Sequence, residues 1–222
     1  MISNSLFPET TTNLAHTLTE TYRPRTVADF IGLEKPKQRM RSLIARPKES
    51  AWLFVGPSGM GKTTLALAVA EEMQAELTHI PSRRCTIEAV EAVRRRCQYV
   101  PMAGKRLHLI LVDEADTMTD AAQDAWLSIL DSTNRAPNTV LIFTCNGTER
   151  LADRFRSRCY AVDFTSYGVA KEAAAMLERV WQIETNGNPS APNFQRIVKD
   201  SSNNIRTSLM ELELEIDAAL AK

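Results

Sequence analysis

The segment from Gly56 to Thr63 constrains the fold of this chain more than any other feature. It reads Gly-Pro-Ser-Gly-Met-Gly-Lys-Thr and fits G-x-x-x-x-G-K-[ST] at every fixed position. A short apolar run, 51–55, precedes it, and a strong helix-forming segment, 64–73, follows it. Glycines let the backbone curl its N–H groups toward phosphate oxygens, and the start of a helix adds a favourable dipole. The sequence therefore predicts a phosphate-binding loop between a strand and a helix, and with it the binding of a nucleoside triphosphate.

Two residues of this loop have distinct predicted roles in binding the nucleotide and its metal. The ammonium of Lys62 can reach the β- and γ-phosphates, and the hydroxyl of Thr63 can ligate Mg²⁺. We expect ATP as the nucleotide and Mg²⁺ as the metal. The predicted nucleotide contacts in the loop are Gly56, Pro57, Ser58, Gly59, Met60, Gly61, Lys62, Thr63 and Thr64.

The composition of the chain sets broad limits. Its 222 residues are 44% hydrophobic and 24% charged, as in a soluble globular protein. The net charge is zero, so binding to nucleic acid has to come from local patches rather than from an overall basic field. The cysteines (Cys85, Cys97, Cys145 and Cys159) lack C-x-x-C spacing, which favours buried thiols in a reducing compartment over zinc or disulfides. With no long apolar run and no signal-like start, we expect a cytoplasmic protein, or a nuclear one in a eukaryote, without a membrane partner.

The hydrophobic pattern predicts an α/β fold followed by helices alone. Near-continuous apolar strands favour a parallel sheet covered by helices on both faces. The strands are expected at 51–55, 76–80, 107–112, 139–144 and 160–164, and the helices between them at 64–73, 87–98, 120–131 and 148–155. The helix at 120–131 is expected to begin with Thr119 or Asp120 as its cap, with Gln123 following. From 166 onward only helices are expected, at 167–182, 191–200 and 204–220, with a Gly/Asn/Pro-rich break at 186–189.

Two acidic residues end the predicted strand at 107–112. Asp113 is suited to hold the water shell of Mg²⁺, and Glu114 to orient and deprotonate the attacking water. A solvated strand end is the alternative, but the phosphate-binding loop upstream favours catalysis. The tetrad 113–116 reads Asp-Glu-Ala-Asp, as in DEAD-box RNA helicases, yet their Ser-Ala-Thr motif and second domain are not found here.

Asn146 ends the next predicted strand. Its amide can hydrogen-bond the γ-phosphate or position the attacking water, although asparagine is also common in ordinary loops. We predict it as a catalytic residue.

Taken together, these positions resemble an AAA+ ATPase of the clamp-loader small-subunit family, the replication factor C type and its phage relatives. The resemblance runs from about residue 21 to 215. Five motifs are similar to those of the family: the Tyr-Arg-Pro box at 21–32, the Walker B tetrad at 113–116, sensor 1 at 144–146, the Ser-Arg-Cys motif at 157–159, and sensor 2 at 204–206. The resemblance implies that Tyr22, Ile31 and Gly32 border the adenine pocket.

The resemblance also assigns two arginines to the reaction. Arg158 of the Ser-Arg-Cys motif is expected to act on ATP held by the neighbouring subunit, with Arg154 and Arg156 as alternatives for this role. Arg206 is expected to open a lid helix after the cap signal 203–204. An arginine in a first helical turn opposes the helix dipole, which suggests that it faces an anion.

Other arginines fall where clamp loaders follow the DNA backbone. They are Arg83 and Arg84 after the strand at 76–80, and Arg94 in the run 94–96 on the next helix. Contacts of this kind give sequence-independent, salt-sensitive binding. A solvated helix face is the alternative.

The resemblance implies a domain plan and a function. We expect a tail at 1–20, an AAA+ P-loop domain at 21–165 and a three-helix lid at 166–222, with no collar domain after it. The implied function is that of an ATPase subunit that loads a ring-shaped sliding clamp onto primer–template DNA, together with other loader subunits, in a homo- or hetero-oligomer of pentameric type. The segment 124–126 departs from the family, since it reads Asp-Ala-Trp where basic residues are common. Another AAA+ role on DNA, such as helicase loading or fork maintenance, and a structural subunit that does not hydrolyse nucleotide remain alternatives.

Overall fold

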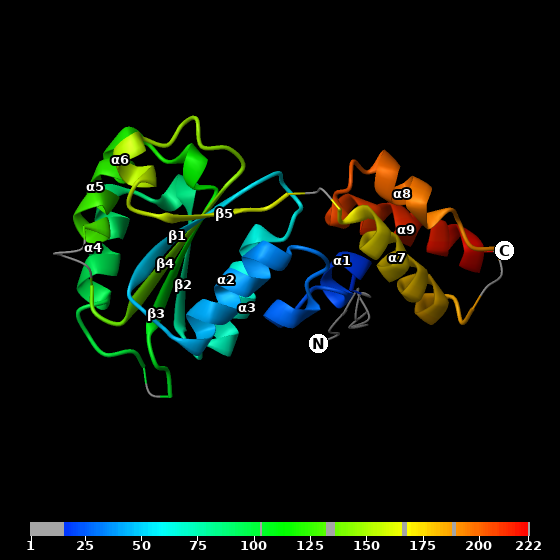
Figure 1. Ribbon diagram of the computed structural model, residues 1–222, viewed down its shortest axis with the longest axis horizontal. Coiled ribbons are helices and arrows are strands. Elements are labelled where there is room, and N and C mark those ends of the chain that lie inside the picture. Colours follow the sequence, from blue (N-terminus) through cyan, green and yellow to red (C-terminus); the bar gives the residue numbers. More distant parts are fainter. Residues whose placement is uncertain (1–15, 103, 132–135, 166–167, 188–189, 222) are drawn as a thin grey trace, which may run out of the picture.

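A parallel sheet forms the centre of the larger part of the protein (Figure 1). The computed structural model describes residues 16–102, 104–131, 136–165, 168–187 and 190–221. The five strands lie in the order β2-β3-β4-β1-β5, and all neighbouring pairs are parallel, as predicted. Their bounds are β1 Ser50–Val55, β2 Glu76–Pro81, β3 His108–Asp113, β4 Thr139–Cys145 and β5 Tyr160–Asp163.

Helices cover both faces of this sheet, which explains why its strands are apolar on both sides. In Figure 1, α2 and α3 lie against one face, and α4, α5 and α6 lie against the other. The helices of the first face are α2 Glu34–Ala45 and α3 Lys62–Glu72; those of the second are α4 Ile87–Arg96, α5 Asp120–Leu130 and α6 Asp153–Arg156. The α/β P-loop fold predicted from the sequence is confirmed.

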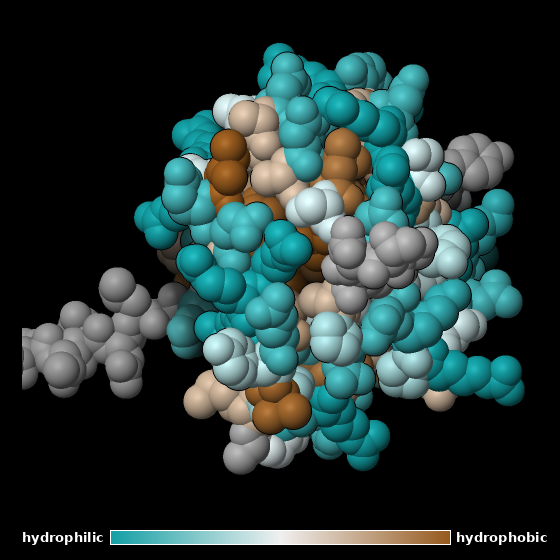
Figure 2. All heavy atoms as spheres, turned by 90° about the vertical axis from the view of Figure 1, so that its left-hand side faces the viewer, coloured by the Kyte–Doolittle hydropathy of each residue, from teal (hydrophilic) through white to brown (hydrophobic). Residues whose placement is uncertain are grey.

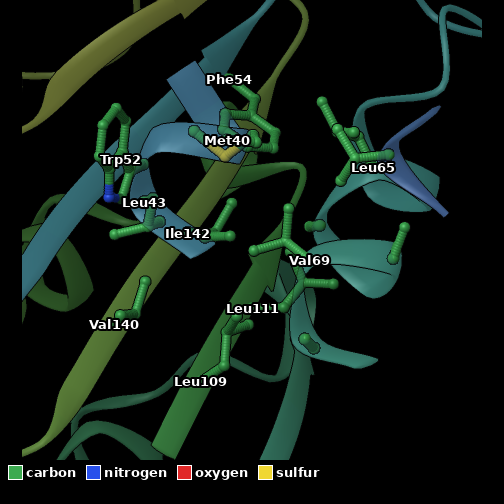
Figure 3. Close-up of a cluster of buried hydrophobic side chains, with 14 of the residues drawn as sticks. Met40, Leu43, Trp52, Phe54, Leu65, Val69, Leu109, Leu111, Val140 and Ile142 are labelled. Carbon is green, nitrogen blue, oxygen red and sulfur yellow. The ribbon is translucent and has the colours of Figure 1, made fainter. Parts of the chain in front are cut away.

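The two hydrophobic cores lie on opposite sides of the same strands. Figure 3 shows the first core, in which Met40 and Leu43 of α2 and Val69 of α3 pack on Leu111 and Ile142 of the sheet. The next residues along the strands point the other way because side chains alternate along a strand. The second core contains Ile110, Val112, Phe143, Trp126 and Phe155.

Several predicted boundaries differ from the observed ones. The segment at 148–155, predicted as a helix, is helical only from Asp153. Its first part is held as a loop by Gln123, whose side chain donates to the carbonyl of Arg150 (3.0 Å) and accepts from the N–H of Ala152 (2.9 Å). Thr119 alone caps α5, accepting from the N–H of Ala122 at 3.2 Å. Gln123 is therefore a buried packing residue rather than part of a cap.

The C-terminal part consists of three helices with a core of their own. They are α7 Ala170–Glu184, α8 Phe194–Asp200 and α9 Ile205–Leu220. Leu177, Trp181, Val198 and Leu212 are buried among these helices, which lie at one end of the molecule in Figure 1. Because most of the buried side chains of this core come from α7, α8 and α9, the three helices pack as one unit beside the sheet.

A short N-terminal segment joins this helical unit to the rest. Leu18, predicted to lie in a loose tail, begins helix α1 (Leu18–Thr21) and is buried against the helical unit. Its N–H donates to a carboxylate oxygen of Glu213 at 3.1 Å. The other part of the predicted tail, 1–15, lies outside the described residues. The described residues also include the short 3₁₀ turns η1 Val27–Asp29, η2 Ser82–Arg84 and η3 Ala115–Thr117.

Within the described residues, no helix is both long and apolar enough to cross a membrane. In the part of the chain that the structure describes, the cysteines are not joined in disulfides; Cys85, Cys97 and Cys145 are buried and Cys159 is partly buried.

Candidate nucleotide-binding site

The predicted phosphate-binding loop lies between β1 and α3, where two of its glycines are required by geometry. Gly56 has φ +154°, and a Cβ there would meet the carbonyl oxygen of Phe164 at 2.2 Å. Gly59 has φ +78°, and a Cβ there would meet Oδ1 of Asn204 at 2.1 Å. Any larger residue at these positions would displace a neighbour. The conformation of the loop therefore depends on contacts with distant parts of the chain.

Lys62 begins α3 and points back into the loop. Its side chain is buried, and the whole residue is only 7% exposed. Nζ donates to the carbonyls of Gly56 (2.6 Å) and Pro57 (2.9 Å) and to Oδ1 of Asn146 (3.0 Å). Burial lowers the pKa of Lys62, because it removes water from the ammonium. An anion placed beside this ammonium would compensate for the lost hydration.

Asp113 ends β3 opposite the start of α3. Its Oδ1 accepts from the hydroxyl of Thr63 at 2.7 Å and from that of Thr144 at 2.5 Å. Its Oδ2 lies 3.8 Å from Nε2 of His79 on β2. The two residues predicted to hold the metal, Thr63 and Asp113, are thus in direct contact.

Glu114 follows in a left-handed conformation, with φ +57°. Its N–H donates to the hydroxyl of Thr144 at 3.0 Å, and its carbonyl accepts from the hydroxyl of Thr117 at 3.1 Å. The side chain is exposed and lines the same cavity as Lys62. The role of Thr144 in holding this turn was not predicted, although the residue belongs to the motif at 144–146.

Asn146 follows β4, which is the neighbour of β3 in the sheet. Its side chain reaches Lys62, and its N–H donates to Oδ2 of Asp116 at 3.3 Å. The thiol of Cys145 is enclosed beside these groups. Burial, followed by the negative charge of Asp116, raises its pKa to about 12. The thiol is therefore neutral and adds no charge to the site.

These groups surround a cavity of about 160 Å³ at the carboxyl ends of the strands. Its position is where parallel sheets bind ligands. The residues that line it are Ser58, Gly59, Gly61, Lys62, Thr63, Thr64, Asp113, Glu114, Thr144, Cys145, Asn146 and Arg206. Gly56 and Pro57 are outside this lining and contribute through the carbonyls that hold Lys62.

A second cavity of about 230 Å³ adjoins the first. Both share Gly59, Gly61, Thr64 and Arg206. Apolar residues from the loop, the N-terminal segment and the C-terminal helices surround it, which suits the flat ring of a base. The residues that line it include Tyr22, Pro24, Phe30, Ile31, Leu33, Met60, Val169, Met176, Ile205 and Leu209.

The three residues expected around adenine behave differently. Tyr22 and Ile31 line the second cavity. The hydroxyl of Tyr22 donates to a carboxylate oxygen of Glu184 at 2.6 Å, and burial together with this partner raises its pKa to about 12. Gly32 is not among the residues that line the second cavity, and its N–H donates to a carboxylate oxygen of Glu172 at 2.7 Å. Its backbone therefore ties the loop at 31–33 to α7.

Arg206 and Asn204 bring the start of α9 to the phosphate-binding loop. Arg206 lines both cavities. Asn204 caps α9 by accepting from the N–H of Thr207 at 3.2 Å, and its Nδ2 donates to the carbonyl of Ser58 at 3.0 Å. This second bond spans 146 residues of sequence, and no local pattern predicts it.

Arg158 is exposed, shortly before β5, and is not among the residues that line the two cavities. Its Nη1 donates to the carbonyl of Arg154 at 2.6 Å. The two arginines named as alternatives for its role each pair with a carboxylate. Arg154 pairs with Asp124 at 2.5 Å, and Arg156 pairs with Asp153. Within the described part of the chain, Arg158 is the member of this trio without a carboxylate partner.

The arginines predicted to contact DNA are exposed. Arg83 and Arg84 lie in η2, directly after β2, at the same edge of the sheet as Asp113. Arg94, on α4, lies 3.8 Å from a carboxylate oxygen of Glu91. Figure 2 shows the side of the molecule that carries α4, α5 and α6, where hydrophilic residues cover most of the surface.

These features define a P-loop nucleotide-binding protein. The glycine-rich loop places Lys62 at the start of a helix, Asp113 lies at the end of β3 beside it, and the neighbouring cavity is large enough for a base. Comparison with known proteins narrows this class. Residues 52–166 match the model of the ATPase family associated with various cellular activities (AAA). The chain belongs to this family.

Similar proteins agree with this assignment. The chain is 32% identical over 157 residues to the replication factor C small subunit of Natronomonas pharaonis, covering 68% of this chain and 48% of that protein. It is 28% identical over 200 residues to the one from Haloarcula marismortui, covering 87% and 60%. The match thus spans about half of the length of these relatives, and the resemblance to clamp-loader small subunits is confirmed.

Among solved structures, the RuvB Holliday junction branch migration motor of Thermotoga maritima superposes with a TM-score of 0.71. Sequence identity is 20%, and the match covers 86% of this chain and 64% of that one. This likeness supports the AAA+ fold and leaves the function to the site and the sequence relatives.

Proposed function

We propose that this chain is an ATPase subunit of a sliding-clamp loader, which uses ATP to place a ring-shaped clamp on primer–template DNA. The observation that carries the proposal is the joined pair of Thr63 and Asp113 beside Lys62 and Glu114, in a chain similar to replication factor C small subunits. A subunit that only binds nucleotide would need none of the hydrolytic carboxylates. Such a protein would act in the cytoplasm or, in a eukaryote, in the nucleus.

The donor set fits the expected ligands. Mg²⁺ prefers oxygen ligands, and the hydroxyl of Thr63 and the carboxylate of Asp113 are already in contact at the cavity wall. When bound, the metal would neutralise charge on the β- and γ-phosphates. The larger, mainly apolar cavity suits adenine, with Tyr22 and Ile31 in its wall.

Different residues of the chain then carry out the steps of hydrolysis. Lys62 leaves the loop carbonyls for the phosphates, and Asn146 is released to orient a water molecule. Glu114 takes a proton from this water as its oxygen attacks the γ-phosphorus, and the bond to the β–γ bridging oxygen breaks to give ADP and phosphate. Arg206, at the start of α9, meets the phosphate charge from the other side.

Arg158 is proposed to act on a neighbouring subunit. It is exposed, it lies outside the cavities of its own chain, and no carboxylate engages it among the described residues. In a loader of pentameric type, its guanidinium would stabilise the transition state next door. Arg83, Arg84 and Arg94 would follow the DNA backbone, with a salt dependence typical of phosphate contacts.

The first test measures ATP hydrolysis by the full chain with its sliding clamp, other loader subunits and primer–template DNA. We expect DNA to stimulate hydrolysis, and Glu114→Gln to abolish the stimulation. Absence of hydrolysis in the complete mixture would contradict the proposal. Capture of a hexameric helicase instead of a clamp would favour the helicase-loading alternative.

The second test separates action between subunits from action within one. Arg158→Ala should keep nucleotide affinity but lose stimulated hydrolysis, and mixing it with Lys62→Ala should restore part of the activity. Arg156→Ala is the matched control, because Arg156 lies two positions away and is paired with Asp153. A mixture that assembles by native mass yet shows no rescue would refute the shared site.

A further inference from the structure

Thr144 connects the two acidic residues of the site, although neither the loop motif nor the reaction scheme assigns it a task. Its hydroxyl donates to Oδ1 of Asp113 at 2.5 Å and accepts from the N–H of Glu114 at 3.0 Å. The residue is 1% exposed. The hydroxyl thus donates to Asp113, the last residue of the neighbouring strand β3, and accepts from Glu114, the residue that follows it.

The position of this hydroxyl is fixed by the sheet. Thr144 lies on β4, and its Cα is paired with that of Phe54 on β1. On the other side of β4, the preceding Phe143 is paired with Val112 of β3. A β-branched side chain in a strand has few rotamers, so its oxygen has little freedom to move. The contact with Glu114 is therefore set by the strand ladder rather than by a flexible loop.

Glu114, by contrast, has an unfavourable backbone. Its φ of +57° is uncommon for a residue with a side chain and has to be held by its surroundings. Thr117 holds the carbonyl and Thr144 holds the N–H. Without the hydroxyl of Thr144, this N–H would lose its acceptor, and the turn that aims the Glu114 side chain would relax.

We propose that Thr144 is a positioning residue, whose hydroxyl fixes Glu114 relative to Asp113. It thereby places the carboxylate of Glu114, which accepts the proton, beside the carboxylate of Asp113, which holds the metal. This inference rests on the proposed hydrolytic function, because it deepens the role of the same site. Thr63 also donates to Asp113, but it belongs to the phosphate-binding loop and makes no bond to the Glu114 turn among the described contacts. Thr144 is thus the link between the two carboxylate residues.

Two variants isolate the hydroxyl, and a third serves as control. Thr144→Val removes the hydroxyl at nearly constant shape, and Thr144→Ser keeps it while removing the methyl group. Thr139→Val is the matched control, because Thr139 lies on the same strand, is also 1% exposed, and donates its hydroxyl to the carbonyl of Pro137 at 2.9 Å. Thr139 begins β4, whereas Thr144 lies near its end at the site.

The first readout is amide hydrogen exchange at Glu114 in the nucleotide-free protein, which tests the link without any bound ligand. Thr144→Val should speed exchange at this amide by about 10-fold or more, as expected when a held N–H loses its partner. Thr144→Ser should stay within about 3-fold of the wild type, and Thr139→Val should leave this amide unchanged. Unchanged exchange in Thr144→Val would overturn the proposed link.

The second readout is hydrolysis, separated from binding. Thr144→Val should lower kcat by about 10- to 100-fold, the usual range for residues that orient a site, while nucleotide affinity changes by less than about 3-fold. Thr144→Ser should restore kcat. If Thr144→Val fails to fold, Thr144→Ala compared with Thr144→Ser gives the same contrast. A positioning role would be refuted if Thr144→Ser lost as much kcat as Thr144→Val or Thr144→Ala. A similar loss of kcat in Thr139→Val would also refute it. If the wild type shows no hydrolysis but Thr144→Val still speeds exchange at Glu114, only the proposed function is refuted.

Discussion

Replacing Gly59 by alanine tests how the phosphate-binding loop and α9 are held together. The change has two separable costs. Gly59 has φ +78°, where a side chain costs about 1 kcal/mol after allowance for the stiffer unfolded chain. The new Cβ would also meet Oδ1 of Asn204 at 2.1 Å, so Asn204 has to move away.

Moving Asn204 removes two hydrogen bonds. It caps α9 through the N–H of Thr207, a contact of a kind worth about 1 kcal/mol. It also donates to the carbonyl of Ser58, and a partly exposed neutral bond contributes about 0.5 kcal/mol. Together with the backbone term, Gly59→Ala should lower the free energy of unfolding by about 2.5 kcal/mol, which corresponds to roughly 5–10 °C in Tm for a chain of this size.

Gly104→Ala is the matched control, because Gly104 has φ +85° but nothing within 4 Å of an added Cβ. It should cost only the backbone term of about 1 kcal/mol. Asn204→Ala should cost about 1.5 kcal/mol alone but less than about 0.5 kcal/mol when added to Gly59→Ala, since the bonds are already lost. Urea unfolding of the wild type, the three single variants and the double variant measures these values. Equal costs for Gly59→Ala and Gly104→Ala, or additive costs in the double variant, would refute the reasoning.

Three further predictions follow from the cores and the site. Phe155→Ala should destabilise the protein by about 3–5 kcal/mol in urea unfolding, because Phe155 is fully buried and packs edge-to-face on Phe143 with ring centroids 4.9 Å apart. The hydrogen bond from Arg96 holds the pKa of Glu76 below its ordinary value of 4.5, so its stabilisation is present above that pH and is lost as the pH falls through the folded pKa. Glu76→Gln should therefore cost about 2 kcal/mol at pH 7 and weaken the acid dependence of Tm; an unchanged pH profile would contradict this. Burial lowers the pKa of Lys62, so Lys62→Met should lower the free energy of unfolding of the nucleotide-free protein by less than about 1 kcal/mol. The same variant should lose the rise in Tm that ATP gives the wild type. A rise like that of the wild type would show that Lys62 does not bind phosphate.

The sequence by itself determined the local parts of this protein. The loop pattern at 56–63, the apolar runs and the acidic pair after 112 predicted the strand–loop–helix unit, the parallel sheet and the edge at which the site lies. These features follow from local rules, since side-chain periodicity and glycine conformation act within a few residues. The boundaries of β1, β2 and β4 were accordingly predicted to within one residue.

Only the tertiary structure decided which distant groups meet. Sequence periodicity does not specify that Asn204 reaches Ser58, that Gln123 holds the segment before α6, or that Thr144 joins Asp113 to Glu114. Each of these bonds joins residues far apart in the chain, so it depends on strand order, register and helix packing. The apolar pattern within one segment does not specify which strands become neighbours, because strand order depends on how complete elements pack. The choice is made by the packing of complete elements, which brings the polar groups of the site to hydrogen-bonding distance.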